Sequence, residues 1–273
     1  MGQDFRLMAK RNLRFIYDNK YPQFWCDGLF CALKELEKDF DIQYQNLAFD
    51  EQKNGKYDFV LGWGGFGGSV DEAMTSCSGP RGLCLAGNAI PPISGRHYDV
   101  IFYETDWVRE FLQLDNLKTK LVKAFGINDA IFAPLNIATP VIWDYIGVGA
   151  LANWKRWEKM ATKTGNRLVI GEYQRDNEKE SLEIASNLLK MGVMVSPMVH
   201  SFDLANYYHW SRVCYIPSSI IGGGERAVLE ARACGCKVEV EPDNPKLVEL
   251  LNTPIVGFRE YAKQLKKGIE SVS

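Results

Sequence analysis

The sequence lacks an excess of charge of either sign, a long apolar run and a leader-like beginning. Its 273 residues include 32 lysines and arginines against 34 aspartates and glutamates, a formal net charge of -2. A broad basic face for nucleic acid is therefore not indicated, although a local basic groove stays compatible with this balance. The longest apolar runs are broken by Asp144 and by glycines, well short of the roughly 20 residues that cross a bilayer. Because the N-terminal residues carry charges and no apolar segment, we expect a cytoplasmic protein without an integral membrane segment.

Histidine is scarce and cysteine is irregularly spaced. The chain has three histidines and seven cysteines, and no two cysteines stand in CxxC spacing. Zinc sites are built from such clusters, so we expect no metal site. An odd number of cysteines inside apolar segments indicates buried, reduced thiols in a cytosolic protein.

Strand-like apolar runs alternate with segments of helical period along the whole chain. In the first half we expect strands at residues 13–17, 40–47, 57–63, 83–85, 100–103 and 130–133, and helices at 24–38, 70–75 and 107–114. A proline-marked stretch, residues 134–140, then indicates a domain boundary. In the second half we expect strands at residues 142–148, 167–171, 193–197, 212–217 and 237–241, and helices at 154–164, 178–191, 203–210, 225–234 and 245–252.

This alternation predicts parallel sheets with helices on both faces. We therefore predict an α/β protein of two Rossmann-like domains facing a central cleft, with residues 1–137 in the first domain and 138–256 in the second. Residues 257–273 form a basic amphipathic helix whose apolar stripe contains Tyr261, Leu265 and Ile269. We expect this helix to pack back on the body, with a membrane-surface helix as the alternative. Ligands of such sheets bind beyond the carboxyl ends of the strands.

Three successive glycines, Gly222, Gly223 and Gly224, follow a predicted strand and open a predicted helix. They belong to the segment PSSIIGGGERAVLEARACGC, residues 217–236. Glycines let backbone N–H groups approach an anion closely, and a helix N-terminus adds partial positive charge. We expect this loop to bind a phosphate or a polar sugar, and a glycine-rich tight turn is the alternative. The Walker A pattern GxxxxGK[ST] is absent, so the loop is not a P-loop.

Glu230 lies in the helix that follows these glycines, five residues after Glu225. A carboxylate close to a glycine loop can accept hydrogen bonds from both hydroxyls of a ribose. The alternative is a glutamate on the helix surface that pairs with a lysine or an arginine.

A second loop, VGALANWKRW at residues 148–157, ends a predicted strand at Gly149. Lys155 and Arg156 follow at the carboxyl edge of the first strand of the second domain, where they face the cleft. Two cations suit a diphosphate there, because lysine supplies a point charge and arginine a bidentate fork. A solvated basic turn is the alternative.

Together these segments resemble the donor domain of GT-B glycosyltransferases, specifically the retaining family 4. In that family a diphosphate-binding lysine follows the glycine of the first C-terminal strand by six residues, as Lys155 follows Gly149 here. The family also has a Pro-Ser dipeptide, a glycine loop and a helix ending in EAxAxG. The matching residues are Pro217, Ser218, Glu230, Ala231, Ala233 and Gly235. The resemblance covers residues 133–252 in consistent order, and the first half fits the fold alone.

Two positions depart from the family pattern. The arginine that usually follows the strand glycine is replaced by Ala150, and Arg156 is the candidate to take its place. The glutamate that usually precedes the ribose glutamate by eight residues is replaced by Gly222. Glu225 is one substitute, and binding of the sugar by backbone N–H groups alone is another.

The family reads its nucleobase through the main chain after the third C-terminal strand, which corresponds here to Met198, Val199 and His200. Arg175, after the second strand, is available to an anion.

The first half offers two clusters for the acceptor side of the cleft. Residues 62–68, GWGGFGG, hold five glycines in seven positions, which suggests close backbone approach to a ligand, and we place Gly64 and Gly65 there. Glu104 and Asp106 end another strand and are candidates for acceptor binding or base catalysis, with a helix cap as the alternative.

The resemblance implies transfer of a hexose or pentose, with retention and without a metal, from a nucleoside diphosphate sugar such as a UDP-sugar to a glycan or other hydroxyl acceptor. The donor is a substrate, and we expect no cofactor. The expected donor-binding residues are Gly149, Lys155, Arg156, Met198, Val199, Gly222, Gly223, Gly224, Glu225, Arg226 and Glu230. The catalytic candidates are Glu225, Glu104 and Asp106. Two alternatives stay open, namely a catalytically inactive binding protein of this fold and a transferase whose acceptor is a hydroxylated DNA base.

Overall fold

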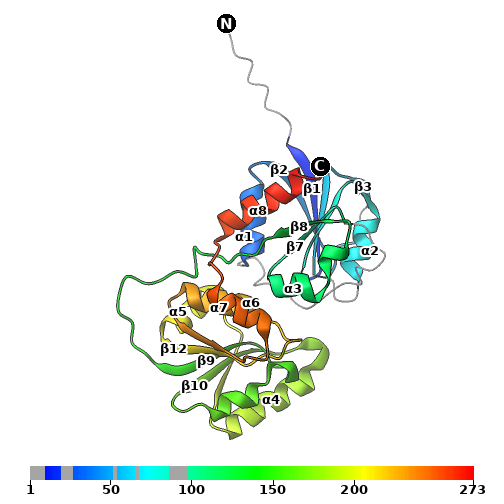
Figure 1. The fold of residues 1–273 in the computed structure, drawn as a ribbon. Coiled ribbons are helices and arrows are strands. Elements are labelled where there is room, and N and C mark those ends of the chain that lie inside the picture. Colours follow the sequence, from blue (N-terminus) through cyan, green and yellow to red (C-terminus); the bar gives the residue numbers. More distant parts are fainter. Residues whose placement is uncertain (1–9, 20–26, 52–53, 65–67, 86–97) are drawn as a thin grey trace.

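A computed structural model describes residues 10–19, 27–51, 54–64, 68–85 and 98–273 (Figure 1). Within these residues the chain forms two large parallel sheets, one in each half, and a two-stranded sheet of β3 (Gly55–Lys56) and β5 (Cys77–Ser78). The predicted α/β class with a Rossmann-like parallel sheet in each half is confirmed.

The sheet of the first half has six described strands, all parallel. In sheet order they are β2 (Phe40–Asn46), β1 (Arg11–Tyr17), β4 (Phe59–Trp63), β6 (Arg81–Cys84), β7 (Val100–Tyr103) and β8 (Lys120–Lys123). Side chains alternate between its faces, so that Phe15 and Leu61 pack against one helix layer while Ile16 and Val60 pack against the other. The helices are α1 (Gly28–Leu36) on the first face, and α2 (Ser69–Thr75) and α3 (Asp106–Phe111) on the second.

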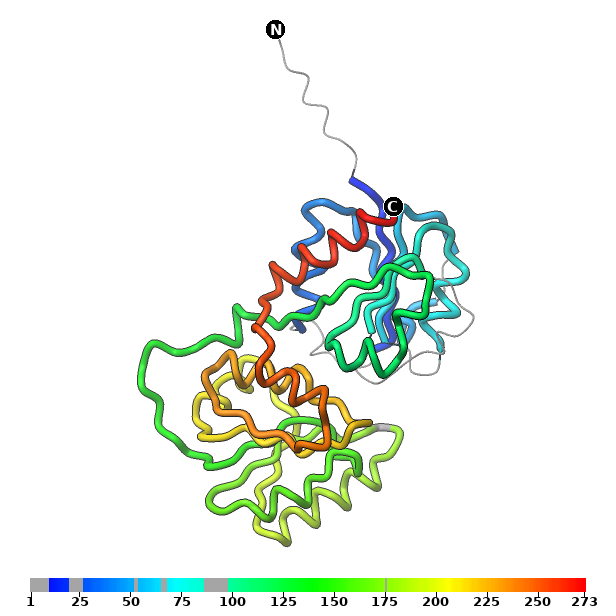
Figure 2. The backbone as a smooth tube through the Cα atoms, viewed as in Figure 1, coloured from blue at the N-terminus to red at the C-terminus, as the bar shows by residue number. Residues whose placement is uncertain are grey.

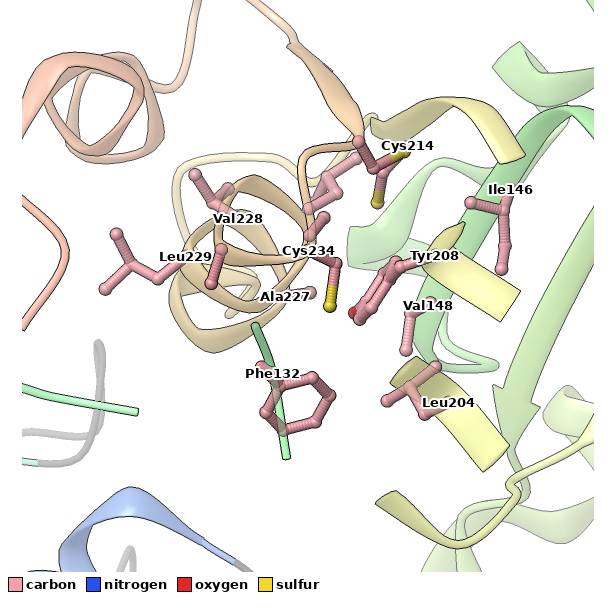
Figure 3. Packing of buried hydrophobic residues seen from close by; sticks show 14 of the residues in the cluster. Phe132, Ile146, Val148, Leu204, Tyr208, Cys214, Ala227, Val228, Leu229 and Cys234 are labelled. Atoms are coloured by element: carbon pink, nitrogen blue, oxygen red, sulfur yellow. The ribbon is translucent and has the colours of Figure 1, made fainter. Parts of the chain in front are cut away.

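The sheet of the second half has five parallel strands. In sheet order they are β11 (Met194–Pro197), β10 (Arg167–Glu172), β9 (Trp143–Ala150), β12 (Ser211–Ile216) and β13 (Lys237–Val240). One face packs against α5 (Ser201–His209), α6 (Glu225–Ala233) and α7 (Pro245–Asn252), and the other against α4 (Glu178–Lys190) and a 3-10 segment, Trp157–Thr162. Figure 3 shows the first of these cores, in which Tyr208 meets Phe132 edge to face, with ring centroids 6.1 Å apart.

The last helix, α8 (Phe258–Glu270), returns to the first half and lies beside α1 (Figure 1). Tyr261, Leu265 and Ile269, the predicted apolar stripe, are buried in the core of that half. The chain thus passes between the halves twice (Figure 2), and the two connections meet in a bridge between Ile127 and Gly257.

Two sequence predictions of local structure were wrong, and one strand of the first sheet was missed. Residues 130–133 form a turn rather than a strand, because the amides of Ile131 and Phe132 donate to the Asn128 carbonyl. The edge strand β8 was missed, since its lysines leave it without an apolar pattern. The helix predicted at residues 154–164 is two 3-10 segments, Asn153–Lys155 and Trp157–Thr162, separated by Arg156 in a left-handed conformation at φ 53°.

Candidate functional site

Two loops meet at the carboxyl edge of the second sheet. One follows β9 and the other follows β12, and these strands are neighbours in the sheet. The amide of Ser219 in the second loop donates to the carbonyl of Trp154 in the first, at 2.8 Å. The fold therefore places the two sequence motifs, residues 148–157 and 217–224, side by side.

Gly149 lets Lys155 fold back over the end of β9. Its φ of 148° disfavours any residue with a side chain. A Cβ built on Gly149 would lie 3.2 Å from Cε and 3.3 Å from Nζ of Lys155. The six-residue spacing between the two residues thus corresponds to a direct packing contact.

The Lys155 ammonium is buried between the two loops. Lys155 is only 5% exposed, and its Nζ donates to the carbonyl of Gly223. Burial lowers the pKa of Lys155 to about 8, and the charge of Lys246 adds to this shift while that of Glu225 opposes it. At neutral pH the side chain is a buried cation, which is a rare arrangement outside ligand or ion-pair sites.

Glu225, the first residue of α6, is bound within the protein. It is 6% exposed, and its Oε2 accepts from the amide of Gly224 at 2.7 Å. Its Oε1 forms an ion pair with Lys246. Burial raises the pKa of Glu225, but the charges of Lys246 and Lys155 outweigh burial and hold that pKa below its ordinary value. Both carboxylate oxygens are therefore engaged, which favours a positioning role over a catalytic one.

The three glycines of the loop differ in what surrounds them. A Cβ on Gly222 would lie 2.9 Å from Cδ1 of Trp154, and one on Gly224 would lie 2.9 Å from Cγ2 of Ile216. Gly222 and Gly224 are thus required by packing. Gly223 has room, because its nearest neighbour would be Oε2 of Glu225 at 3.4 Å.

The amides of the loop also differ. Gly222 N–H donates to the Ser219 carbonyl and Gly224 N–H donates to Glu225. Among the described residues none accepts from Gly223 N–H. Of the three predicted amide donors, Gly223 is the one that the structure leaves for a ligand.

Arg156 holds the glycine-loop backbone. Its guanidinium donates to the carbonyls of Pro217 at 2.7 Å and Ser218 at 2.9 Å. It also donates to both oxygens of Asp243, at 2.6 and 2.8 Å. With its donors engaged in this way, Arg156 supports the loop rather than standing in for the family arginine beside the diphosphate.

Arg226 and Glu230 lie one turn apart on α6. Arg226 is exposed, with 53% of its side chain accessible, and pairs with Asp27, the N-cap residue of α1 in the first half. Glu230 is buried, and burial raises its pKa to about 7, against the opposing charge of Arg226. The helix-surface alternative for Glu230 is therefore wrong.

The predicted nucleobase loop follows β11. Met198 and Val199 are half-buried against the core, and His200 is exposed at the start of α5. The His200 and Phe202 rings stack with centroids 5.3 Å apart.

The acceptor-side candidate Asp106 of the first half is in contact with helix α7 of the second half. Asp106 pairs with Lys123 at 2.7 Å, and its amide and that of Trp107 donate to Glu249 of α7 at 2.9 and 3.0 Å. The predicted helix cap is present at the start of α3, where the Thr105 hydroxyl accepts from the amide of Val108 at 3.2 Å, and Glu104 just before it is half-buried.

Gly64 is buried, and among the described residues a Cβ there would meet only the Asp18 carbonyl, at 3.8 Å. Gly65 lies outside the described residues, and the side chain of Arg175 is likewise not described.

Sequence reasoning missed Lys246 and Glu249. Both lie on α7, which starts at Pro245, directly after the loop that follows β13. Their position after a strand of the second sheet was the available signal, but it does not reveal which loop each side chain contacts.

No protein-family model and no curated protein matches the sequence. Solved structures do match the fold. HepE of Anabaena, in complex with UDP-glucose, superposes with a TM-score of 0.63 at 12% identity, over 96% of this chain and 90% of that one. AviGT4, a glycosyltransferase involved in avilamycin A biosynthesis, gives 0.58 at 11% identity, over 96% and 98%. The chain has a GT-B fold.

A putative UDP-N-acetylglucosamine 2-epimerase from Listeria monocytogenes also matches the fold, with a TM-score of 0.53 at 13% identity, over 97% of this chain and 89% of that one. The fold alone therefore does not determine the reaction.

Within the part of the chain that the structure describes, no group of three or more histidines, cysteines, aspartates or glutamates is placed to hold a metal ion. No described helix is long and apolar enough to span a membrane.

Proposed function

We propose that this protein transfers a sugar, with retention, from a nucleoside diphosphate sugar to a hydroxyl acceptor. The observation that carries the proposal is the buried Lys155 ammonium, packed on Gly149 and bonded to the glycine loop at the carboxyl edge of the second sheet. Parallel α/β sheets bind their ligands at this edge. A desolvated cation beside a free amide is suited to a diphosphate.

In the proposed reaction the bond between the sugar C1 and the diphosphate oxygen breaks, and a bond from C1 to the acceptor oxygen forms on the same face. The acceptor proton passes to the departing diphosphate. Lys155 and Gly223 N–H would stabilise the negative charge that grows on the leaving oxygen. The protein's own cation, rather than a divalent metal, would hold the diphosphate, and Glu230 would accept from the ribose hydroxyls.

The test is turnover of UDP-, GDP- and ADP-sugars labelled in the sugar, followed by NMR of the anomeric proton with glycan acceptors and hydroxymethylated DNA. We expect an α-linked product from an α-linked donor, unaffected by a chelator. Lys155→Ala should abolish turnover, whereas Lys159→Ala should preserve it, because Lys159 lies in the next 3-10 segment and pairs with Glu241.

Three outcomes would contradict the proposal in different ways. Nucleotide binding without turnover indicates an inactive binding protein. An epimerised free sugar indicates a different reaction on the same fold. A product of inverted configuration contradicts retention alone.

A further inference from the structure

Three charged side chains from three segments are buried under the glycine loop. Lys155 comes from the loop after β9, Glu225 from the start of α6 and Lys246 from the start of α7. Lys246 is 0% exposed, which is exceptional for a lysine. Each of these charges would be costly to bury without a partner.

The three charged groups do not pair equally with one another: Glu225 pairs with Lys246, whereas Lys155 bonds to a backbone carbonyl. The Glu225 carboxylate takes the Lys246 ammonium on Oε1 and the Gly224 amide on Oε2, at 2.7 Å for the amide. The Lys155 ammonium bonds to a neutral carbonyl, that of Gly223. A Cβ on Gly223 would lie 3.4 Å from Oε2 of Glu225 and 4.0 Å from Nζ of Lys155, so both groups flank this glycine. The nearby carboxylate is therefore partnered by Lys246 and not by Lys155.

The location of Lys246 is unfavourable for stability alone. It is the second residue of an eight-residue helix, where the helix dipole disfavours a cation. A buried ion pair contributes little net stability compared with uncharged residues of similar volume. The ion pair between Lys246 and Glu225 is therefore better explained by a role in the function of the glycine loop than by stability.

We propose that Lys246 is a positioning residue that occupies the Glu225 carboxylate, so that the charge of Lys155 stays available to the diphosphate of the donor. With Lys246 in place the three groups carry a net charge of one positive unit. Without it, Glu225 would become the ion-pair partner of Lys155 and cancel its charge. This inference rests on the proposed donor site and adds to it a residue that does not itself contact the ligand.

Two other charged groups act on Lys155. Glu172, at the end of β10, favours its charged form, and Arg226 on α6 disfavours it. These groups stay in place in every variant below, so differences between the variants report on Lys246 and Glu225.

The experiment compares Lys246→Met, Glu225→Gln and the double variant E225Q/K246M by calorimetry with UDP, GDP and ADP. We expect Lys246→Met to weaken binding by about tenfold or more, the scale of a lost hydrogen bond to a charged group. The double variant should recover most of this loss, because removing both charges frees Lys155 again. Lys163→Met is the control, since its ion pair with Glu239 at 3.1 Å lies away from the loop, and it should bind like the parent.

A second readout follows Lys155 itself, by NMR titration of its labelled Nζ and Cε atoms. Lys246→Met should raise the titration midpoint of Lys155, and the double variant should return it toward the parent value. Because the charge of Lys246 itself lowers the pKa of Lys155, a raised midpoint supports the inference only together with weakened nucleotide binding that the double variant restores. A merely structural role of Lys246 would lower the melting temperature and leave nucleotide affinity at the parental value. If Lys246→Met does not fold, Lys246→Gln takes its place.

Two results overturn the inference while leaving the donor site intact. One is parental affinity in Lys246→Met, whatever the midpoint, when Lys155→Ala does lose binding. The other is a double variant as weak as Lys246→Met. If the parent binds none of the three nucleotides, the proposed function fails, and this inference fails with it.

Discussion

The carboxyl edges of the two sheets are built differently although both carry glycine-containing loops. The second edge buries Lys155, Glu225 and Lys246 in a cluster where each polar contact is made within the protein. The first edge leaves Asp106 exposed, with its ion pair to Lys123 on the surface. Its helix start is capped from the other half by Glu249.

Under the proposed function, this difference separates a donor side from an acceptor side. Buried charge is costly and is often retained where a ligand uses it, so the proposal places the donor at the carboxyl edge of the second sheet. The first edge has solvated groups that contribute little stability and can change partners when an acceptor binds.

The glycine loops should respond unequally to the same substitution. Gly224→Ala places a methyl group 2.9 Å from Cγ2 of Ile216 at a φ of 148°, so we expect a loss of about 2–4 kcal/mol in unfolding free energy. Gly64→Ala also has a positive φ, but among the described residues its nearest contact is the Asp18 carbonyl at 3.8 Å, and about 1 kcal/mol is expected. Urea denaturation measures both. Equal losses would mean that the second loop is no more tightly packed than the first.

Glu230→Gln should stabilise the protein and weaken donor binding. The pKa of Glu230 is raised to about 7 by burial, so its contribution to stability is complete below pH 4.5 and is lost as the pH rises through 7. Glutamine does not titrate, so the variant does not lose stability in this way. Between pH 4.5 and 7, its free energy of unfolding should rise by about 1–3 kcal/mol relative to that of the parent. Denaturation at pH 5 and pH 7.5 checks this.

The same Glu230→Gln variant tests the ribose contact. Glutamine offers one acceptor oxygen and no charge, so nucleotide affinity should fall in calorimetry. Parental affinity would remove Glu230 from the site.

Nucleotide affinity and stability should depend on pH with opposite signs above pH 8. The pKa of Lys155 is lowered to about 8, chiefly by burial, and the diphosphate favours its charged form. Nucleotide affinity should therefore be highest below pH 8 and should fall by up to about tenfold for each pH unit above 8. The unfolded lysine titrates near 10.5, so the contribution of Lys155 to the unfolding free energy rises between pH 8 and 10.5. Calorimetry and denaturation at pH 7, 8 and 9 should lose these trends in Lys155→Met.

Glu249→Ala should have the smallest effect, because the group caps a short helix at the boundary between the halves. We expect about 1 kcal/mol in unfolding free energy from the lost cap on α3. Glu260→Ala removes a glutamate from the surface pair with Lys263 and should stay within about 0.5 kcal/mol. A loss as small as that of the control would show that the cap does not hold the first edge in place.

The sequence predicted the central strands of the second sheet well because β9, β10 and β12 are rich in buried apolar residues. The edge strand β8 was missed because a lysine stands at each end of its four residues, which leaves no apolar pattern to recognise. The break at Arg156 was invisible, because no sequence signal marks a left-handed arginine whose conformation depends on its bonds to Pro217 and Ser218.

The site was predictable where its residues are close in the chain. The Gly149 and Lys155 spacing led directly to a packing contact. The pairing of Glu225 with Lys246 was not predictable, since it joins the starts of two helices and depends on how these pack. For the same reason the sequence assigned Glu225 to the ligand, whereas the structure engages it with protein groups.

The most direct test of the donor site is calorimetry of UDP, GDP and ADP with the parent, Lys155→Ala and Lys123→Ala. Lys123 is the matched lysine at the edge of the first sheet, where it pairs with Asp106 and Glu249. We predict that at least one nucleotide binds the parent, that Lys155→Ala weakens it by about 1.5–3 kcal/mol, and that Lys123→Ala changes it by less than about 0.5 kcal/mol. Equal affinities in the parent and Lys155→Ala, with both proteins folded, would contradict the account.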